Sequence, residues 1–200
     1  LKLHDLPAEP FVQAVVAPGV HDRVITSEGQ RARIGDAIES GGLSGLKPAL
    51  VWLDANDPGG PRSTICHGDF HPLNIMADAG QVTGVIDWAN VVVAAPEMDV
   101  GSALTNITAA PLEVPFAVRP MLRMAIRSGL GAYLRAYRRK RPLDDRAVRF
   151  YQVFPALHQL TWSAITVRNG LAGGGAFGSE AGIRNLIAYI ERCAGVEVEV

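Results

Sequence analysis

A cluster of polar side chains in one short segment constrains the fold of this chain more than any other feature. Residues 66–76 read CHGDFHPLNIM, so two histidines, an aspartate and an asparagine interrupt a stretch otherwise suited to a buried strand and a turn. His67, Asp69 and Asn74 stand in the spacing H-x-D-x-x-x-x-N. So many polar groups in an apolar stretch indicate a functional loop. Burying a polar group costs free energy unless it forms a hydrogen bond or binds a ligand.

A second motif follows the loop at a distance that suits a hairpin. The stretch 74–88 reads NIMADAGQVTGVIDW, and it predicts a β-hairpin with its turn at about 78–80. Such a hairpin would return Asp87 to the neighbourhood of Asn74. We expect Trp88 to pack beneath the site that these residues form.

The oxygen-bearing side chains match the needs of phosphoryl transfer from a nucleotide. That reaction uses Mg²⁺ to neutralise phosphate oxygens, and Mg²⁺ takes oxygen ligands from very few protein groups. Asn74 offers an amide oxygen and Asp87 a carboxylate, while Asp69 is placed to lie near the attacking hydroxyl. The spacing of the loop is also that of the catalytic loop of kinases.

CHGDFHPLNIM followed by GVIDW resembles the signature of the aminoglycoside phosphotransferase family, small-molecule kinases related to choline kinases. The resemblance implies that Asp69 is the catalytic base and that Asn74 and Asp87 hold magnesium, two ions in all, with ATP or GTP as phosphate donor. It also implies three residues that support the catalytic loop: His67, His71 and, in the string APEMDVGSAL, Asp99.

The family also implies a part that this sequence lacks. Kinases of this type carry a glycine-rich loop and a phosphate-binding lysine in an N-terminal β-lobe, whereas Lys2 and Lys47 are the only lysines before the loop. The expected fold is therefore α+β and mainly α-helical: residues 1–200 form a protein-kinase-like C-terminal lobe with a small β-hairpin, the N-terminal β-lobe being absent. We expect 1–26 to be an irregular lead-in and the isolated chain to be inactive.

Periodicity places helices on both sides of the hairpin. Ser27 is the expected N-cap of a helix that ends at Gly41. Prolines at 111–120 predict a break between helices. The remaining helices are expected at 47–55, 121–139, 144–169 and 180–194.

The acceptor is a hydroxylated small molecule, since lobes of this kind handle aminoglycosides, macrolides, choline, homoserine and other metabolites. Acceptor residues in the family come from the late helices and their loops. Asp144, Asp145 and Glu180 are therefore candidate contacts for a cationic substrate.

Two other functions compete with the kinase interpretation. His67, Asp69 and His71 would share one face of a strand and could bind zinc in a metal-dependent hydrolase, although this leaves Asn74 and Asp87 unexplained. A non-catalytic pseudokinase or binding lobe would explain the missing N-terminal half.

Composition narrows the partners and the compartment. With 200 residues, 48% of them hydrophobic, a single domain can bury a sizeable core. A formal net charge of −1 gives no electrostatic case for nucleic acid, and no apolar run is long enough to span a membrane. Two cysteines are too few for a disulfide framework, so we expect a cytoplasmic protein.

Overall fold

The computed structural model describes residues 3–16, 22–60, 64–112, 114–171 and 175–200. Its α-helices are α1 (Ala8–Val16), α2 (Asp22–Ile25), α3 (Ser27–Ser40), α4 (Lys47–Ala55), α5 (Glu97–Ala109), α6 (Arg119–Arg138), α7 (Asp145–Arg168) and α8 (Glu180–Ala194). Its strands are β1 (Thr64–Cys66), β2 (Ile75–Asp78), β3 (Gln81–Val85) and β4 (Val92–Ala94). Short 3₁₀ turns are η1 (Leu3–Asp5), η2 (Ser44–Leu46), η3 (Pro72–Asn74), η4 (Trp88–Asn90), η5 (Phe116–Val118) and η6 (Gly175–Gly178). The prediction of a mainly α-helical α+β fold is confirmed.

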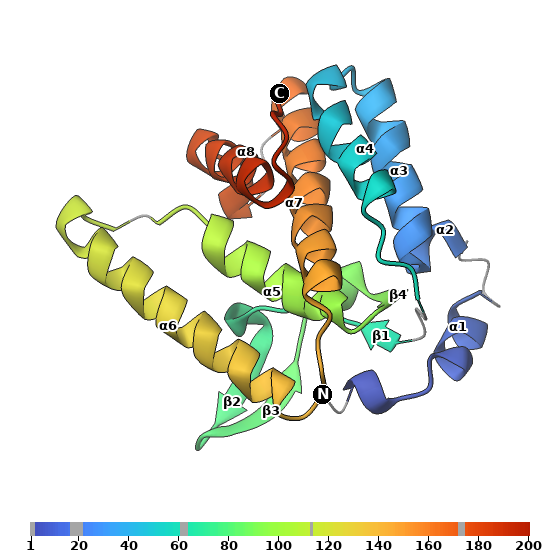
Figure 1. Cartoon of the computed structure of the whole chain (residues 1–200), viewed down its shortest axis with the longest axis vertical. Coiled ribbons are helices and arrows are strands. Elements are labelled where there is room, and N and C mark those ends of the chain that lie inside the picture. The colour runs from blue at the N-terminus through green and yellow to red at the C-terminus, as the bar shows by residue number, and fades with distance from the viewer. Residues whose placement is uncertain (1–2, 17–21, 61–63, 113, 172–174) are drawn as a thin grey trace.

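Helix α7 forms the centre of the molecule, with α3 and α4 on one side and α5 and α8 on the other (Figure 1). Its buried aromatic residues Phe150, Tyr151 and Phe154 pack against one another and against aliphatic side chains of the neighbouring helices. Burying a side chain of this size stabilises the fold by roughly 1.5–3 kcal/mol. None of the described helices is both long enough and apolar enough to cross a membrane.

A proline and a glycine allow α5 to approach α7 closely. Pro155 lies inside α7 and has no N–H, so the carbonyl of Tyr151, four residues earlier, loses its usual helical partner. Gly101 of α5 lies against this carbonyl, and a Cβ at position 101 would overlap the Tyr151 oxygen. The contact fixes α5, which carries several residues of the candidate site.

The four strands form two separate antiparallel pairs. In one, β1 pairs with β4, so that Thr64 faces Ala94. In the other, β2 and β3 form the predicted hairpin with Ile75 opposite Val85. Its turn contains Gly80, whose φ of +78° suits glycine. The hairpin prediction is confirmed.

The structure confirms the helices predicted for 47–55 and 180–194, and it moves the ends of the others by one or two residues. One cap was predicted wrongly. Thr26, not Ser27, caps α3, since its hydroxyl accepts a hydrogen bond from the N–H of Gly29 at 3.1 Å. The hydroxyls of two neighbouring residues compete for such a role, and sequence alone does not separate them.

The prediction of an irregular lead-in over 1–26 was wrong for the part that the structure describes. Ala8–Val16 is helical despite Pro10. Pro10 is the third residue of α1, where the N–H group of a helix has no partner within the helix, so proline removes nothing. A proline at this position is therefore compatible with a helix, and the effect of a proline depends on its position within the first turn.

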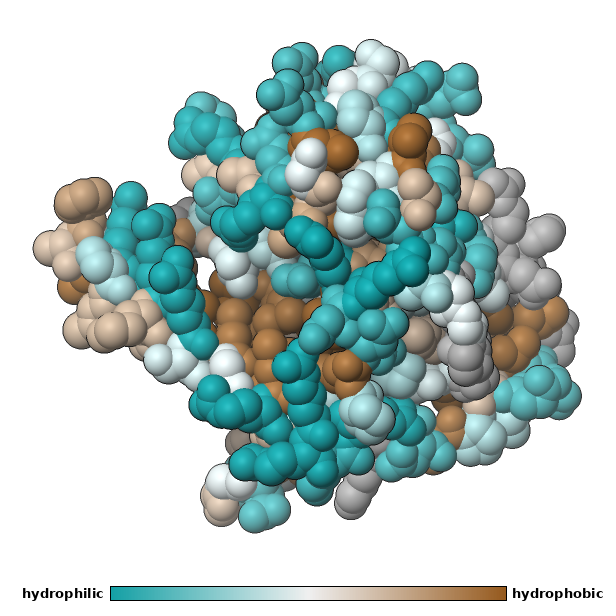
Figure 2. Space-filling model, in the orientation of Figure 1, coloured by the Kyte–Doolittle hydropathy of each residue, from teal (hydrophilic) through white to brown (hydrophobic). Residues whose placement is uncertain are grey.

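Helix α6 runs apart from the rest of the molecule along much of its length (Figure 1). Its C-terminal half packs through Leu130, Leu134 and Tyr137 onto a small cluster that includes Leu104 of α5. Figure 2 shows hydrophobic surface in a hollow between α6 and α5, bordered by hydrophilic side chains. The hollow lies on the side of α5 that faces α6.

Candidate active site

Asp99 holds the backbone of the predicted catalytic loop. It lies in the first turn of α5, and its side chain is almost completely buried. Its Oδ2 accepts from the N–H of His67 at 3.0 Å, and its Oδ1 accepts from the N–H of Gly68 at 2.9 Å. The structure therefore places Asp99 beneath the loop, where it fixes the residues immediately before Asp69.

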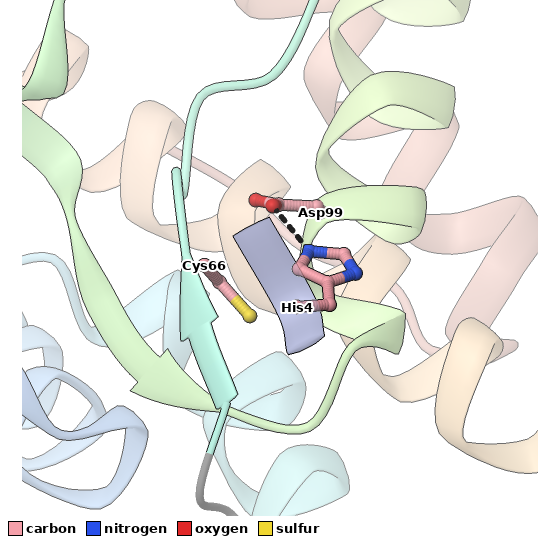
Figure 3. A group of neighbouring side chains, drawn as sticks. All are labelled: His4, Cys66 and Asp99. Atoms are coloured by element: carbon pink, nitrogen blue, oxygen red, sulfur yellow. Dashed lines mark hydrogen bonds and ion pairs between the residues drawn. The ribbon is translucent and has the colours of Figure 1, made fainter. Parts of the chain in front are cut away.

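A third bond to Asp99 comes from the start of the chain (Figure 3). Nε2 of His4 donates to Asp99 Oδ2 at 2.8 Å, and Nδ1 of His4 lies 2.8 Å from the hydroxyl of Tyr137. Burial raises the pKa of Tyr137 to about 12, so this hydroxyl keeps its proton at neutral pH and can donate to His4. Sequence reasoning missed His4, because it lies 95 residues from its partner.

Cys66 completes this buried group, with ligand-type atoms of His4, Cys66 and Asp99 lying within 4.8 Å of one another. Burial, followed by the charge of Asp99, raises the pKa of the Cys66 thiol well above its ordinary value. The thiol therefore stays protonated, and the carboxylate oxygens are already occupied by three N–H donors. The group is a hydrogen-bonded support for the loop.

His67 connects the loop to the far end of the hairpin. Its ring is fully buried; Nδ1 accepts from the N–H of Asp69 at 3.3 Å, and Nε2 lies 2.8 Å from the carbonyl oxygen of Ile86. The Nε2–H tautomer satisfies both bonds. The ring also lies 4.7 Å from that of Trp88 between centroids. Trp88 thus packs against the loop, but it is 40% exposed and is not a core residue.

Two amide side chains hold Asp69 from the opposite side. Nδ2 of Asn106 donates to Asp69 Oδ1 at 2.6 Å, and Oδ1 of Asn106 accepts from Nε2 of Gln159 at 2.6 Å. His71 approaches the same carboxylate, with 3.7 Å between Nε2 and Asp69 Oδ1. The side-chain contacts of Asp69 with Asn106 and His71 thus both use Oδ1, and neither uses Oδ2.

The sequence analysis also missed Asn106, although a signal was present. Asp99, Ser102 and Asn106 stand at i, i+3 and i+7 in α5, and this spacing places them on one face of the helix. All three are buried, and each one bonds to the catalytic loop: Ser102 donates to the carbonyl oxygen of Gly68 at 2.9 Å. The spacing of these three polar residues would therefore have identified the helix face that supports the loop.

The hairpin brings Asn74 and Asp87 to its open end. The N–H of Ile86 donates to the carbonyl oxygen of Asn74 at 3.0 Å, so the pairing of the strands extends to the residue immediately before Asp87. Nδ2 of Asn74 bonds to the carbonyl of Asp69 at 2.9 Å and approaches His71 Nε2 at 3.3 Å. Asp87 is exposed and adopts the left-handed conformation, with φ of +62°.

The donor set of Asn74 and Asp87 fits Mg²⁺. Both hydrogen bonds of the Asn74 amide use its nitrogen, which leaves the oxygen outside them. Asp87 adds an exposed carboxylate at the same end of the hairpin. Mg²⁺ is commonly bound by one or two such oxygens together with substrate phosphates.

The zinc alternative is not assembled in the structure. Both ring nitrogens of His67 are engaged, one with Asp69 N–H and the other with the Ile86 carbonyl. Among the described residues, the group able to offer three metal ligands is His4, Cys66 and Asp99, not His67, Asp69 and His71.

A pocket of about 820 Å³ opens beside Asp69. Its walls come from the catalytic loop, from the end of α5, from α6 and from the second half of α7. The three acidic residues expected to contact a cationic substrate do not line it. Asp144 caps α7, Asp145 pairs with Arg138, and Glu180 pairs with Arg184. Asp145 is roughly 14 Å along α7 from Phe154, the first residue of that helix to line the pocket, so the structure does not place it in the pocket beside Asp69.

A comparison with known protein families identifies the family of this chain. The Phosphotransferase enzyme family matches residues 3–151, which is most of the chain. The chain therefore belongs to this family, the aminoglycoside phosphotransferase-like kinases that the residues resemble. No curated protein sequence gives a significant match.

Two solved structures are similar to the chain. One is a thermostable mutant of aminoglycoside phosphotransferase APH(4)-Ia in a ternary complex with AMP-PNP and hygromycin B, with 21% identity and a TM-score of 0.49 over 76% of this chain. The other is a thermostable mutant of the same enzyme in its apo form, with 22% identity and a TM-score of 0.48 over 95% of this chain. The chain spans about half the length of these structures, 45% and 54% respectively.

Proposed function

We propose that this chain supplies the catalytic and acceptor-binding lobe of a small-molecule kinase that transfers the γ-phosphate of ATP or GTP to a hydroxyl group. One observation carries the proposal. The carboxylate of Asp69 is bonded through one oxygen to Asn106, at the edge of a pocket large enough for a drug-sized molecule. A base held in this way has its second oxygen available for the hydroxyl of an acceptor.

Asp69 acts as the catalytic base in this proposal. The acceptor hydroxyl donates to Asp69 Oδ2, and its oxygen forms a bond to the γ-phosphorus as the bond from that phosphorus to the β–γ bridging oxygen breaks. The hydroxyl proton passes to Asp69, and the nucleoside diphosphate leaves. Because the transition state of such reactions is loose, the base chiefly positions the nucleophile.

Asn74 and Asp87 are the proposed magnesium ligands. Bound Mg²⁺, two ions as in related kinases, would neutralise the charge that develops on the phosphate oxygens. Asp99, His67 and His71 are positioning residues: Asp99 holds the backbone immediately before Asp69, His67 holds the N–H of Asp69 itself, and His71 contacts the side chains of Asp69 and Asn74. Their effect on the reaction passes through Asp69 and Asn74.

A β-rich lobe elsewhere in a longer protein would complete the nucleotide site. In kinases of this type a lysine of that lobe holds the phosphates, and we expect the isolated chain to turn over slowly without it. Because the donor is a nucleoside triphosphate and both cysteines are free thiols, we propose that the enzyme acts in the cytoplasm.

The test is a reaction of the complete protein with Mg²⁺, ATP or GTP and a panel of hydroxylated acceptors, read by mass spectrometry. We expect a phosphorylated product that disappears in Asp69→Asn. Absence of product together with absence of nucleotide binding would favour a non-catalytic binding lobe instead.

A further inference from the structure

The pocket beside Asp69 has walls that are almost free of charge. Among the described residues that line it, Asp69 is the one carboxylate, and neither lysine nor arginine contributes to the lining. The larger side chains of the wall are apolar or aromatic: Ile107, Ile126, Phe154, Trp162 and Phe177. Binding of an apolar molecule to such a wall is favourable because it buries apolar surface, and among the described lining residues Asp69 alone offers a carboxylate to neutralise a cation.

The polar side chains that α7 contributes to the wall are neutral as well. His158 accepts a hydrogen bond from Nε1 of Trp162 at 3.0 Å, and burial, with a smaller contribution from the charge of Arg33, lowers the pKa of His158 to about 4. It is therefore uncharged at neutral pH. Thr166 and Ser163 add hydroxyls to the same wall.

One polar atom near the pocket has no partner. Oε1 of Gln159 is buried and makes no hydrogen bond to any residue that the structure describes, while its Nε2 bonds to Asn106. A buried carbonyl oxygen without a partner costs about 1–3 kcal/mol. A hydroxyl or amide N–H of a bound molecule would donate a hydrogen bond to this oxygen. Gln159 is itself bonded to Asn106, the side chain that contacts Asp69.

We propose that the acceptor is an uncharged, largely apolar alcohol of drug size rather than a polycationic aminoglycoside. This inference rests on the proposed function and specifies its substrate class. One hydroxyl of the acceptor meets Asp69, a second donor meets Gln159 Oε1, and the apolar body packs on Ile107, Ile126 and Trp162. The volume of about 820 Å³ suits a molecule far larger than choline or an amino acid.

A competition among acceptor classes tests the inference in the complete protein. The neutral probes are chloramphenicol and the macrolactone erythronolide B, the polycationic probes are hygromycin B and kanamycin, and choline represents small cations. Binding is measured by calorimetry without nucleotide, and transfer by mass spectrometry with Mg²⁺ and ATP or GTP. We expect a neutral probe to bind at least about 100-fold more tightly than either polycation, with an affinity that changes less than about twofold between 0.05 and 0.5 M NaCl.

Two variants locate that binding. Ile126→Glu places a carboxylate in the wall and should weaken binding of the neutral probe at least about tenfold, whereas Met121→Glu, on the exposed face of the same helix and outside the pocket, should not. Trp162→Ala should weaken it to a similar degree, and thermal melting of each variant shows whether it is folded. Retained affinity in both folded wall variants would overturn the proposed binding site.

The outcomes separate this inference from the proposed function. Binding of a neutral probe without transfer of phosphate would overturn the kinase function while keeping the binding inference. Transfer to hygromycin B or kanamycin in preference to every neutral probe would keep the kinase function and overturn this inference. Failure of both neutral probes to bind at millimolar concentration would also overturn it.

Discussion

Asp99 and Asp87 are both aspartates of the candidate site, but their surroundings differ. Asp99 is 4% exposed and accepts hydrogen bonds from His67, Gly68 and His4. Asp87 is exposed, makes no side-chain hydrogen bond to a described residue, and adopts a φ of +62° that few residues other than glycine adopt. Hydrogen bonds within the fold thus fix the position of Asp99. The carboxylate of Asp87 makes no such bond, and its backbone conformation carries some strain.

This difference indicates how Asp99 and Asp87 serve the proposed reaction. The position of Asp69 follows from packing within the chain, through Asp99 on one side and Asn106 on the other. The left-handed conformation of Asp87 is consistent with its proposed role as a magnesium ligand. The same substitution at the two aspartates should therefore have different consequences.

The largest effect is expected for Asp99→Asn. The amide would present an N–H₂ group to backbone N–H donors and remove a buried charge that pairs with His4, so the free energy of unfolding should fall by about 3 kcal/mol. Because Asp69 would shift, kcat should fall at least about 100-fold. Urea unfolding and steady-state kinetics of the complete protein measure the two effects. Unchanged stability would show that the buried network is not a support.

Asp87→Asn should lower activity without lowering stability. Asparagine also tolerates the left-handed conformation, so the free energy of unfolding should stay within about 0.5 kcal/mol of the wild type. Loss of the carboxylate should reduce Mg²⁺-dependent nucleotide affinity and kcat about 100-fold. Asp78→Asn, at the exposed tip of the same hairpin, is the matched control and should change neither. Equal nucleotide affinity in the Asp87 variant and the wild type would refute the metal-ligand assignment.

Acid should destabilise the buried side of the site through His158. Its pKa is about 4 in the folded chain and about 6.5 when unfolded, so between these values the unfolded state binds more protons and stability falls as pH falls. The loss between pH 7 and pH 4 should be about 2–3 kcal/mol. Urea unfolding at both pH values should show a smaller loss in His158→Gln. An equal loss in the two proteins would assign the acid sensitivity to other groups.

The smallest effect is expected for Asn106→Leu. Removing the hydrogen bond to the Asp69 carboxylate should lower kcat about tenfold, while Asp69 keeps its backbone support from Asp99. Thr108→Leu, an exposed position two residues further along α5, is the control. A loss as large as that of Asp69→Asn would mean that Asn106 itself contacts the acceptor.

Local patterns were sufficient for much of the fold. The helices at 47–55 and 180–194 and the hairpin follow from periodicity, from proline and glycine positions, and from turn residues that act over a few neighbours. The prediction failed at Pro10 and at Thr26, where the outcome depends on which position within one turn a residue occupies. The exposure of Trp88 was not predicted, because exposure depends on what packs over a side chain.

The residues of the site also divide into those that the sequence reveals and those that it does not. His67, Asp69, Asn74 and Asp87 could be recognised because the loop and the hairpin place them together within a single stretch of chain. His4 and Gln159 could not, because each one reaches the site from a distant part of the chain, and the one signal for Asn106 was its spacing from Asp99 and Ser102 on α5. Burial decides whether such a contact forms, and burial is a property of the assembled core.

The sequence by itself determined the class of chemistry, since the loop and the hairpin carry the reactive groups at fixed short spacings. Only the tertiary structure decided how Asp69 is held and what lies beside it. Its supports and the uncharged pocket wall come from α5, α6 and α7, which are separated from the loop by tens of residues. Packing of α5 on α7, through Gly101 and Pro155, brings the α5 and α7 residues together.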